Sequence, residues 1–307
     1  MILVATYNRL ALLKKAIDSI EEQTHCSHEI IVIDGGSTDG TIEYLRSNPG
    51  VTPVFQGELI GTARAYNQVW RQVKSKYTCW LSDDTEVVGG SLDQAIGILE
   101  SQPQIGLVGL KMKDTEGPWV KVPYLGGFSK YGVLNCNHGV LPMNLLRAVN
   151  YFNENYRAYM IDPDLTASVL CSGRHVVMTK HIGLFHHREW ATSSDWQDKI
   201  RRDEDGIDNK KIYLDRFKFL EEVNAPSINF KTWLDRRLGR SVYFLCKPDS
   251  IWLGQNRRDW RNLIQGRFIR FTDPIENIGR PFHLVQRLPR HLLLSEANPV
   301  VVTKLDR

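Results

Sequence analysis

The chain has 307 residues, of which 42% are hydrophobic and 24% are charged, and its formal net charge is +4. This length and composition indicate a globular protein with a sizeable core, either one large domain with an appendage or two modest domains. They exclude a low-complexity chain, and no apolar run approaches the roughly 20 residues that a membrane-spanning helix needs.

Apolar runs and amphipathic helical patterns alternate through the first hundred residues. Four short strands, each rich in aliphatic or β-branched residues, are expected near 1–5, 29–33, 51–56 and 77–81. Helices are expected between them, from apolar residues three and four positions apart, around 10–20, 41–47 and 66–73. The alternation predicts an α/β fold of right-handed βαβ units, with a mostly parallel central sheet flanked by helices.

A polar loop follows the first, second and fourth of these strands, at 6–9, 34–41 and 82–86. In open α/β sheets ligands bind outside the carboxyl ends of the strands, so we expect the three loops to surround a ligand site. Their polar groups suit a nucleotide. The sequence has neither a G-x-G-x-x-G nor a G-x-x-x-x-G-K-[ST] motif, which argues against a dinucleotide-binding fold and a P-loop.

The third loop carries three carboxylates, Asp83, Asp84 and Glu86. Carboxylates this close repel one another unless a cation lies between them, and Mg²⁺ or Mn²⁺ suits oxygen ligands of this kind. The alternative is a solvated acidic turn that caps the next helix. From this loop alone the two interpretations stay open.

Four sequence blocks, in order, resemble those of the family 2 glycosyltransferases, whose domain has the GT-A fold. Ala5-Thr6-Tyr7-Asn8-Arg9 resembles P-T-Y-N-R, and 31–41 resembles V-V-D-x-G-S-T-D-G-T. Residues 61–67 resemble G-x-A-x-A-x-N, and 81–87 resemble L-N-D-D-T-E-V. A fifth, looser block is similar to the family's F-D-E, E-D-x-D-L and late His, at 152–154, 162–165 and 186–187.

The resemblance covers about residues 1–190. It implies a GT-A domain over 1–190, with a donor half at about 1–110 and an acceptor half at about 111–190. A helical, basic region over 191–307 would follow. The activity that it implies is metal-dependent, inverting sugar transfer from a nucleotide-sugar donor to a hydroxyl acceptor, a glycan or a lipid-linked molecule, in glycan or polysaccharide synthesis.

By this resemblance eight residues would bind the nucleotide sugar: Thr6, Tyr7, Asn8, Arg9, Asp34, Gly35, Arg64 and Asp83. Tyr7 would border the base, and Asp34 would hydrogen-bond the nucleoside. Gly35 stands where some members have an acidic residue or Asn, which leaves the base open among uridine, thymidine and guanosine. A half-buried aromatic residue and a surface arginine are the alternatives for Tyr7 and Arg64.

The resemblance also implies a divalent cation, Mn²⁺ or Mg²⁺, held by Asp84 and His186. Ser82 replaces the first residue of the family's Asp-x-Asp motif, so the metal would depend on diphosphate oxygens for further ligands. His186 and His187 are adjacent, and in a strand only one of them can face the site. We expect it to be His186; a structural role is the alternative.

Asp162 fits the family's catalytic base best, with Asp164 as the second candidate, although Ile161 stands where the family has Glu. The alternative is that Asp164 caps a helix and Asp162 is merely exposed. Ser82 and the missing Glu also fit a second function, a nucleotide-sugar-binding protein of the same fold without catalysis.

Basic residues are concentrated near the end of the chain. Residues 230–307 hold 15 Lys and Arg and 7 Asp and Glu, whereas the remainder holds 24 basic and 28 acidic residues. Aromatic residues are interleaved with the arginines. The pattern fits a helical lid or oligomer interface packed on the acidic body, or a surface that meets a membrane or an anionic glycan; nucleic acid is not the expected partner.

Five cysteines are scattered through the chain without C-x-x-C spacing, which indicates reduced thiols and argues against a zinc site. The apolar run at 1–5 has no charged segment before it, so we expect no signal peptide. Together these features predict a cytoplasmic protein, with peripheral membrane contact as an option that the basic region leaves open.

Overall fold

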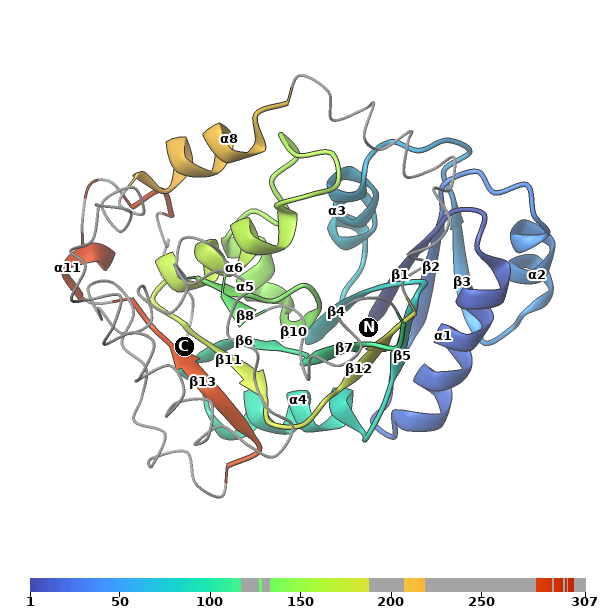
Figure 1. Cartoon of the computed structure of the whole chain (residues 1–307), viewed down its shortest axis with the longest axis horizontal. Coiled ribbons are helices and arrows are strands. Elements are labelled where there is room, and N and C mark those ends of the chain that lie inside the picture. Colours follow the sequence, from blue (N-terminus) through green and yellow to red (C-terminus); the bar gives the residue numbers. More distant parts are fainter. Residues whose placement is uncertain are drawn as a thin grey trace.

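The computed structural model describes residues 1–116, 127–128, 133–187, 207–218, 280–288, 290–294, 296 and 298–300 (Figure 1). The elements over residues 1–116 are β1 (Ile2–Thr6), α1 (Leu10–Gln23), β2 (Ile30–Asp34), α2 (Thr41–Ser47), β3 (Val51–Phe55), α3 (Thr62–Gln72), β4 (Tyr77–Ser82), β5 (Thr85–Val87), α4 (Ser91–Ser101), β6 (Ile105–Gly109) and β7 (Met112–Asp114). Those that follow are β8 (Gly127–Phe128), β9 (Leu134–Asn135), β10 (Gly139–Pro142), α5 (Met143–Ala148), α6 (Ile161–Cys171), β11 (His175–Thr179), β12 (Leu184–His186), α8 (Asn209–Arg216), β13 (Phe282–Gln286) and α11 (Arg290–Leu293).

The central sheet has eight strands in the order β13-β11-β6-β10-β4-β1-β2-β3. The four strands expected from the sequence, β1 to β4, are parallel neighbours at one end of it, and β6 pairs in parallel with β11. The mostly parallel arrangement is therefore confirmed, with two exceptions. β10 is antiparallel to both β4 and β6, and β13 is antiparallel to β11 at the edge.

Alternating side chains of the strands pack into two separate cores. In β1, Leu3 joins one core, and its neighbours Ile2 and Val4 join the other. The first core is filled by apolar residues of α3, α5 and α6, and the second by those of α1, α2 and α4. Figure 1 shows α3, α5 and α6 on one side of the sheet and α4 on the opposite side. The strands are buried on both faces, which explains why they appear in the sequence as continuous apolar runs.

A second, three-stranded sheet of β5, β12 and β7 lies beside the carboxyl end of β4. β12 is its central strand and pairs antiparallel with β5 and parallel with β7. The register places His186 opposite Thr85 on one side and opposite Asp114 on the other. Because Thr85 directly follows the acidic pair 83–84, this sheet joins three distant segments of the chain next to the carboxylates.

The part of 191–307 that the structure describes is only partly helical. It contains helices α8 and α11, and Phe282–Gln286 forms strand β13, which pairs with β11 of the central sheet. The aromatic and basic segment from 230 to 279 lies outside the described residues. Within the described ranges, no helix is both long and apolar enough to cross a bilayer.

Candidate active site

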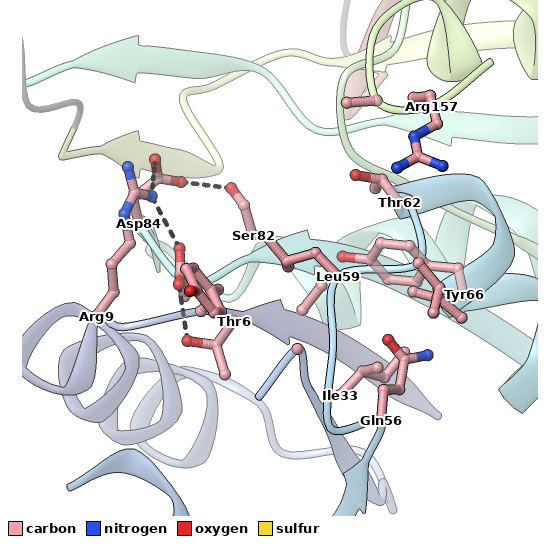
Figure 2. Close-up of a pocket in the computed structure, with 18 of the residues that line it drawn as sticks. Thr6, Arg9, Ile33, Gln56, Leu59, Thr62, Tyr66, Ser82, Asp84 and Arg157 are labelled. Carbon is pink, nitrogen blue, oxygen red and sulfur yellow. Dashed lines mark hydrogen bonds and ion pairs between the residues drawn. The ribbon is translucent and has the colours of Figure 1, made fainter. Parts of the chain in front are cut away.

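A pocket of about 260 Å³ opens at the carboxyl ends of β1, β2 and β4 (Figure 2). Seven of the residues expected from the sequence line it: Thr6, Tyr7, Arg9, Gly35, Asp83, Asp84 and His186. They come from the loops after the three strands and, for His186, from the end of β12. The rule that loops at one edge of a parallel sheet converge therefore applies here.

The two aspartates of the pocket share one arginine. Nη1 of Arg9 lies 3.0 Å from Oδ1 of Asp83 and 3.0 Å from Oδ2 of Asp84. The other oxygen of Asp83 accepts a hydrogen bond from the Thr6 hydroxyl at 2.8 Å. All three charged side chains are almost completely buried. The guanidinium thus balances part of the negative charge that the fold concentrates after β4.

The environments of Asp83 and Asp84 drive their pKa values apart. Burial raises the pKa of Asp83 to about 6, and the adjacent Asp84 charge acts in the same direction against the attraction of Arg9. Burial also disfavours the charge on Asp84, but contacts with His186, Arg9 and Ser82 outweigh it and lower that pKa below its ordinary value. Asp84 is therefore the permanently ionised member of the pair, which suits a metal ligand.

Asp84 has further partners on both sides. The Ser82 hydroxyl donates to Asp84 Oδ1 at 2.5 Å, and Nε2 of His186 lies 3.4 Å from Asp84 Oδ2. On its other side, Nδ1 of His186 lies 2.7 Å from Oδ1 of Asp114. Burial opposes a charge on His186, but the hydrogen bonds to Asp114 and Asp84 outweigh it and raise the pKa of His186 to about 9.

A second histidine, His138, directly precedes β10 and contacts the end of β4 beside Asp84. Its Nδ1 lies 3.1 Å from the Trp80 carbonyl oxygen, and its Nε2 lies 3.4 Å from the Ser82 hydroxyl. Burial, together with the nearby charge of His186, lowers the pKa of His138 to about 4. His138 is therefore neutral near pH 7, unlike His186.

The loops after β1 and β2 hold each other in place. Asn8 has a φ of 53°, in the left-handed region that Asn tolerates better than most residues, and its side-chain oxygen accepts from the Thr38 amide at 2.7 Å. Asp34 is fully buried and accepts from the amides of Gly36 and Ser37. Neither Asn8 nor Asp34 lines the pocket; both carry hydrogen bonds that shape its rim.

Glycines let the rim close tightly. A Cβ on Gly36 would lie 2.4 Å from the carbonyl oxygen of Gly57, and the φ of Gly36 is +92°. At Gly35, a Cβ would meet Cδ2 of Leu59 at 2.5 Å. Gly35 therefore leaves room for Leu59 in the pocket wall.

Three more of the expected residues, besides Asn8 and Asp34, lie outside the pocket lining. Arg64 is exposed on α3 and faces Glu154 at 3.9 Å. Asp162 lies in the first turn of α6, where burial raises its pKa to about 7. Asp164, two residues further along α6, is fully buried and accepts hydrogen bonds from Tyr156 at 3.1 Å and from Arg216 at 2.5 Å. Asp164 thereby links α6 to the loop before it and to α8.

Other lining residues were not expected from the sequence. Gln56 and Leu59 come from the segment between β3 and α3, and Arg157 comes from the loop before α6. The Arg157 carbonyl accepts from the Thr62 amide at 2.7 Å, which ties that loop to the start of α3. Figure 2 shows Arg157 and Asp84 on opposite sides of the pocket. No local motif marks Arg157, because only tertiary packing brings its loop here.

Few side chains in the pocket could coordinate a metal ion. Among the residues that the structure describes, no group of three or more His, Cys, Asp or Glu side chains is arranged to hold one. Asp84 and His186 lie close together, and both are residue types that can coordinate a metal ion. Asp83 is already engaged with Thr6 and Arg9. These residues fit a hard divalent ion only if a ligand supplies most of its coordination sphere, as the phosphates of a nucleotide do.

Comparison with known proteins shows which proteins this chain resembles. The model of glycosyl transferase family 2 matches residues 1–144. An uncharacterized glycosyltransferase of Rickettsia typhi is 33% identical over 98 residues, which are 32% of this chain and 31% of that protein. A GalNAc(5)-diNAcBac-PP-undecaprenol beta-1,3-glucosyltransferase of Campylobacter jejuni is 33% identical over 96 residues, covering 30% of this chain and 31% of that protein. The matches thus span less than a third of these relatives.

Solved structures extend the likeness over most of the chain. A mannosyltransferase of Pyrobaculum calidifontis in complex with GDP-Man and Mn²⁺ has a TM-score of 0.52 and 17% identity, and the match covers 86% of this chain and 85% of that one. The 1–349 portion of S. aureus TarS in complex with UDP has a TM-score of 0.51 and 16% identity, covering 89% of this chain and 93% of that one. Residues 1–144 are therefore similar to glycosyl transferase family 2, and the chain has the GT-A fold.

Proposed function

We propose that the protein is a metal-dependent, inverting glycosyltransferase that moves a sugar from a nucleotide-sugar donor to a hydroxyl acceptor in glycan or polysaccharide synthesis. One observation carries the proposal. The ionised Asp84 and the aromatic Tyr7 line the same pocket, on the part of the chain that matches the family. A nucleobase can stack on an aromatic ring, and a metal-bound diphosphate needs an ionised carboxylate nearby, so one pocket with both suits a nucleotide.

Binding of the donor would use several of the lining residues. Tyr7, Gly35 and the side chain of Gln56 would offer a ring face, a close backbone approach and an amide to a nucleobase. Asp83 and Asp84 would approach the ribose and the diphosphate. The complexes of similar proteins with GDP-Man and with UDP support a nucleotide-sugar donor and leave its base open.

A divalent ion, Mn²⁺ or Mg²⁺, would be held by Asp84 and His186, with diphosphate oxygens and water as its other ligands. When bound, such an ion neutralises negative charge on a departing diphosphate. The Mn²⁺ in the Pyrobaculum mannosyltransferase complex supports the choice of ion.

Asp162 is our choice for the catalytic base. It would accept the proton of the acceptor hydroxyl while that oxygen attacks the anomeric carbon. The bond from that carbon to the diphosphate oxygen breaks on the opposite face, so the sugar configuration inverts and the nucleoside diphosphate leaves. A pKa of about 7 suits a base near neutral pH. Asp164 is the weaker candidate because its oxygens are engaged by Tyr156 and Arg216.

The acceptor class is a glycan or a lipid-linked molecule. The Campylobacter relative is named for an undecaprenol-linked glycan, which supports a lipid-linked acceptor and peripheral contact with a membrane. The basic, aromatic segment at 230–279 would provide that contact or, alternatively, an interface between copies of the chain.

The proposal is tested in two steps. Thermal shift with UDP, GDP and dTDP, each with and without Mn²⁺, identifies the nucleotide, and stabilisation that requires Mn²⁺ is the expected result. The matching nucleotide sugars are then incubated with the protein and Mn²⁺, and released nucleoside diphosphate is measured by chromatography. Mn²⁺-dependent release that Asp162→Asn removes supports the enzyme. Tight donor binding without release, with acceptor extracts present, would instead favour a non-catalytic nucleotide-sugar-binding protein.

A further inference from the structure

We propose that Asp114 is a positioning residue that fixes the His186 imidazole so that its Nε2 faces the metal position beside Asp84. The inference rests on the proposed function, because it assigns a role to Asp114 in the metal site of that function. Asp114 belongs to none of the blocks that resemble the family, and it does not line the pocket.

The second sheet sets this arrangement through strand register. β12 runs between β5 and β7, and His186 is directly opposite Asp114 on β7. On its other side His186 is opposite Thr85, the residue after Asp84. Neighbouring strands lie about 4.8 Å apart, so a side chain on β12 can reach both flanking strands at once. The backbone pairing thus aligns Asp114, His186 and Thr85 in one row, and Asp84 directly precedes Thr85.

The side-chain contacts run from Asp114 through His186 to Asp84. Nδ1 of His186 is 2.7 Å from Asp114 Oδ1, and Nε2 is 3.4 Å from Asp84 Oδ2. When Nδ1 carries the proton that Asp114 accepts, Nε2 has its lone pair directed toward Asp84. A metal ion there would take that lone pair in place of a proton.

Asp114 has no other described function in the fold. Its side chain is completely buried, and His186 is its one hydrogen-bonding side chain among the residues that the structure describes. Its second oxygen, Oδ2, is buried without a partner in those residues. A buried carboxylate with a single histidine partner is costly to the fold, which indicates that the contact with His186 is the reason for its presence.

Carboxylate groups that hold the far nitrogen of a metal-binding histidine fix its tautomer and ring orientation, and their removal typically weakens metal binding about 10–100-fold. We therefore expect Asp114→Asn to weaken Mn²⁺ binding by about that factor while nucleotide binding without metal is retained. The same loss is expected for His186→Asn. The double variant should bind Mn²⁺ no more weakly than His186→Asn, because both changes remove one interaction.

The same sheet offers a matched control. His187, the next residue, has its own carboxylate partner, with Nε2 2.6 Å from Glu86 Oε2. Its Nδ1 lies 3.0 Å from the Thr115 hydroxyl, so neither ring nitrogen faces Asp84. Glu86→Gln therefore removes a histidine–carboxylate contact from the same sheet and should leave Mn²⁺ affinity unchanged.

The experiment measures Mn²⁺ affinity of the full chain by electron paramagnetic resonance, with saturating UDP or GDP, whichever the wild type binds. Circular dichroism and metal-free nucleotide binding verify that each variant is folded. If Asp114→Asn does not fold, Asp114→Ser replaces it, since the smaller side chain leaves room for a water molecule. The ¹⁵N spectrum of the imidazoles gives a second readout without metal: the Nδ1–H signal of His186 should change in the Asp114 variants and persist in Glu86→Gln.

Wild-type Mn²⁺ affinity in either Asp114 variant, with a loss in His186→Asn, would overturn the inference and leave the proposed function standing. A double variant weaker than His186→Asn by the full Asp114 factor would also overturn it, because Asp114 would then act independently of His186. If the wild type itself shows no Mn²⁺-dependent binding of UDP or GDP, the metal part of the proposed function fails, and the inference fails with it.

Discussion

Nη1 of Arg9 lies 3.0 Å from Oδ2 of Asp84, the same oxygen that Nε2 of His186 faces at 3.4 Å. A side-chain cation therefore already occupies the surroundings of the oxygen that we assign to the metal ion. Arg9 also contacts Asp83, so one guanidinium neutralises part of both buried carboxylates in the metal-free protein. A divalent ion that binds Asp84 must share this oxygen with Arg9 or displace it.

Replacing Arg9 should make the protein depend on metal for stability. In Arg9→Gln two buried carboxylates lose their common cation, so we expect the free energy of unfolding without metal to fall by about 3–5 kcal/mol. Mn²⁺ should then raise the melting temperature of the variant more than that of the wild type. Differential scanning calorimetry with and without Mn²⁺ measures both quantities. Arg46→Gln, on the exposed face of α2, is the control; equal stability of Arg9→Gln and wild type would contradict the shared-cation role.

Asp84→Asn should remove the metal-dependent part of donor binding. The amide keeps the shape of the side chain and its contact with Ser82 but loses the negative charge that a hard cation requires. Calorimetric titration of the nucleotide that the wild type binds, with and without Mn²⁺, is expected to give the same affinity in both conditions. A variant whose nucleotide affinity still rises with Mn²⁺ would move the metal site away from Asp84.

Asp162→Asn should reduce transfer by about 10²–10⁴-fold, the usual contribution of a positioned base, with donor affinity unchanged. The wild-type rate should also rise with pH through about 7, because below its pKa the protonated Asp162 cannot accept the acceptor's proton. The pH profile of kcat/KM checks this, and the variant should lack that rise. A wild-type rate that is flat between pH 5 and 8 would argue against Asp162 as the base.

Asp164 should matter for stability and not for the chemical step. Asp164→Ala removes the buried carboxylate that both Arg216 and Tyr156 contact, so we expect the free energy of unfolding to fall by about 3 kcal/mol or more. Asp162→Asn, in the same turn of α6, is the matched comparison and should unfold at the same denaturant concentration as the wild type. The opposite pattern, with Asp164→Ala fully stable but inactive, would exchange the roles that we assign to the two aspartates.

The amino-acid sequence was enough to predict the local structure of the first hundred residues and one edge of the site. The strands and helices of the first hundred residues follow from short apolar runs and helical periodicity, and helix α2 begins and ends where the pattern predicted. Thr6 ends β1 and Asp83 directly follows β4, its parallel neighbour, so their proximity required only the rule that parallel strands end at one edge. Six of the seven expected residues in the pocket meet there for the same reason, whereas His186 comes from β12 of the second sheet.

The side chains that complete that site could not be predicted from the sequence, because tertiary contacts position them. Arg64 is on the helix that the pattern predicted, yet its side chain faces Glu154, while Arg157, from a loop without a motif, lines the pocket. Asp114 meets His186 through the pairing of two short strands, and the two residues are 72 positions apart in the chain. Strands β10 and β13 enter the sheet antiparallel. Periodicity reports which face of an element is buried, whereas the pairing and register of distant strands depend on the packing of the whole core, which no local pattern contains.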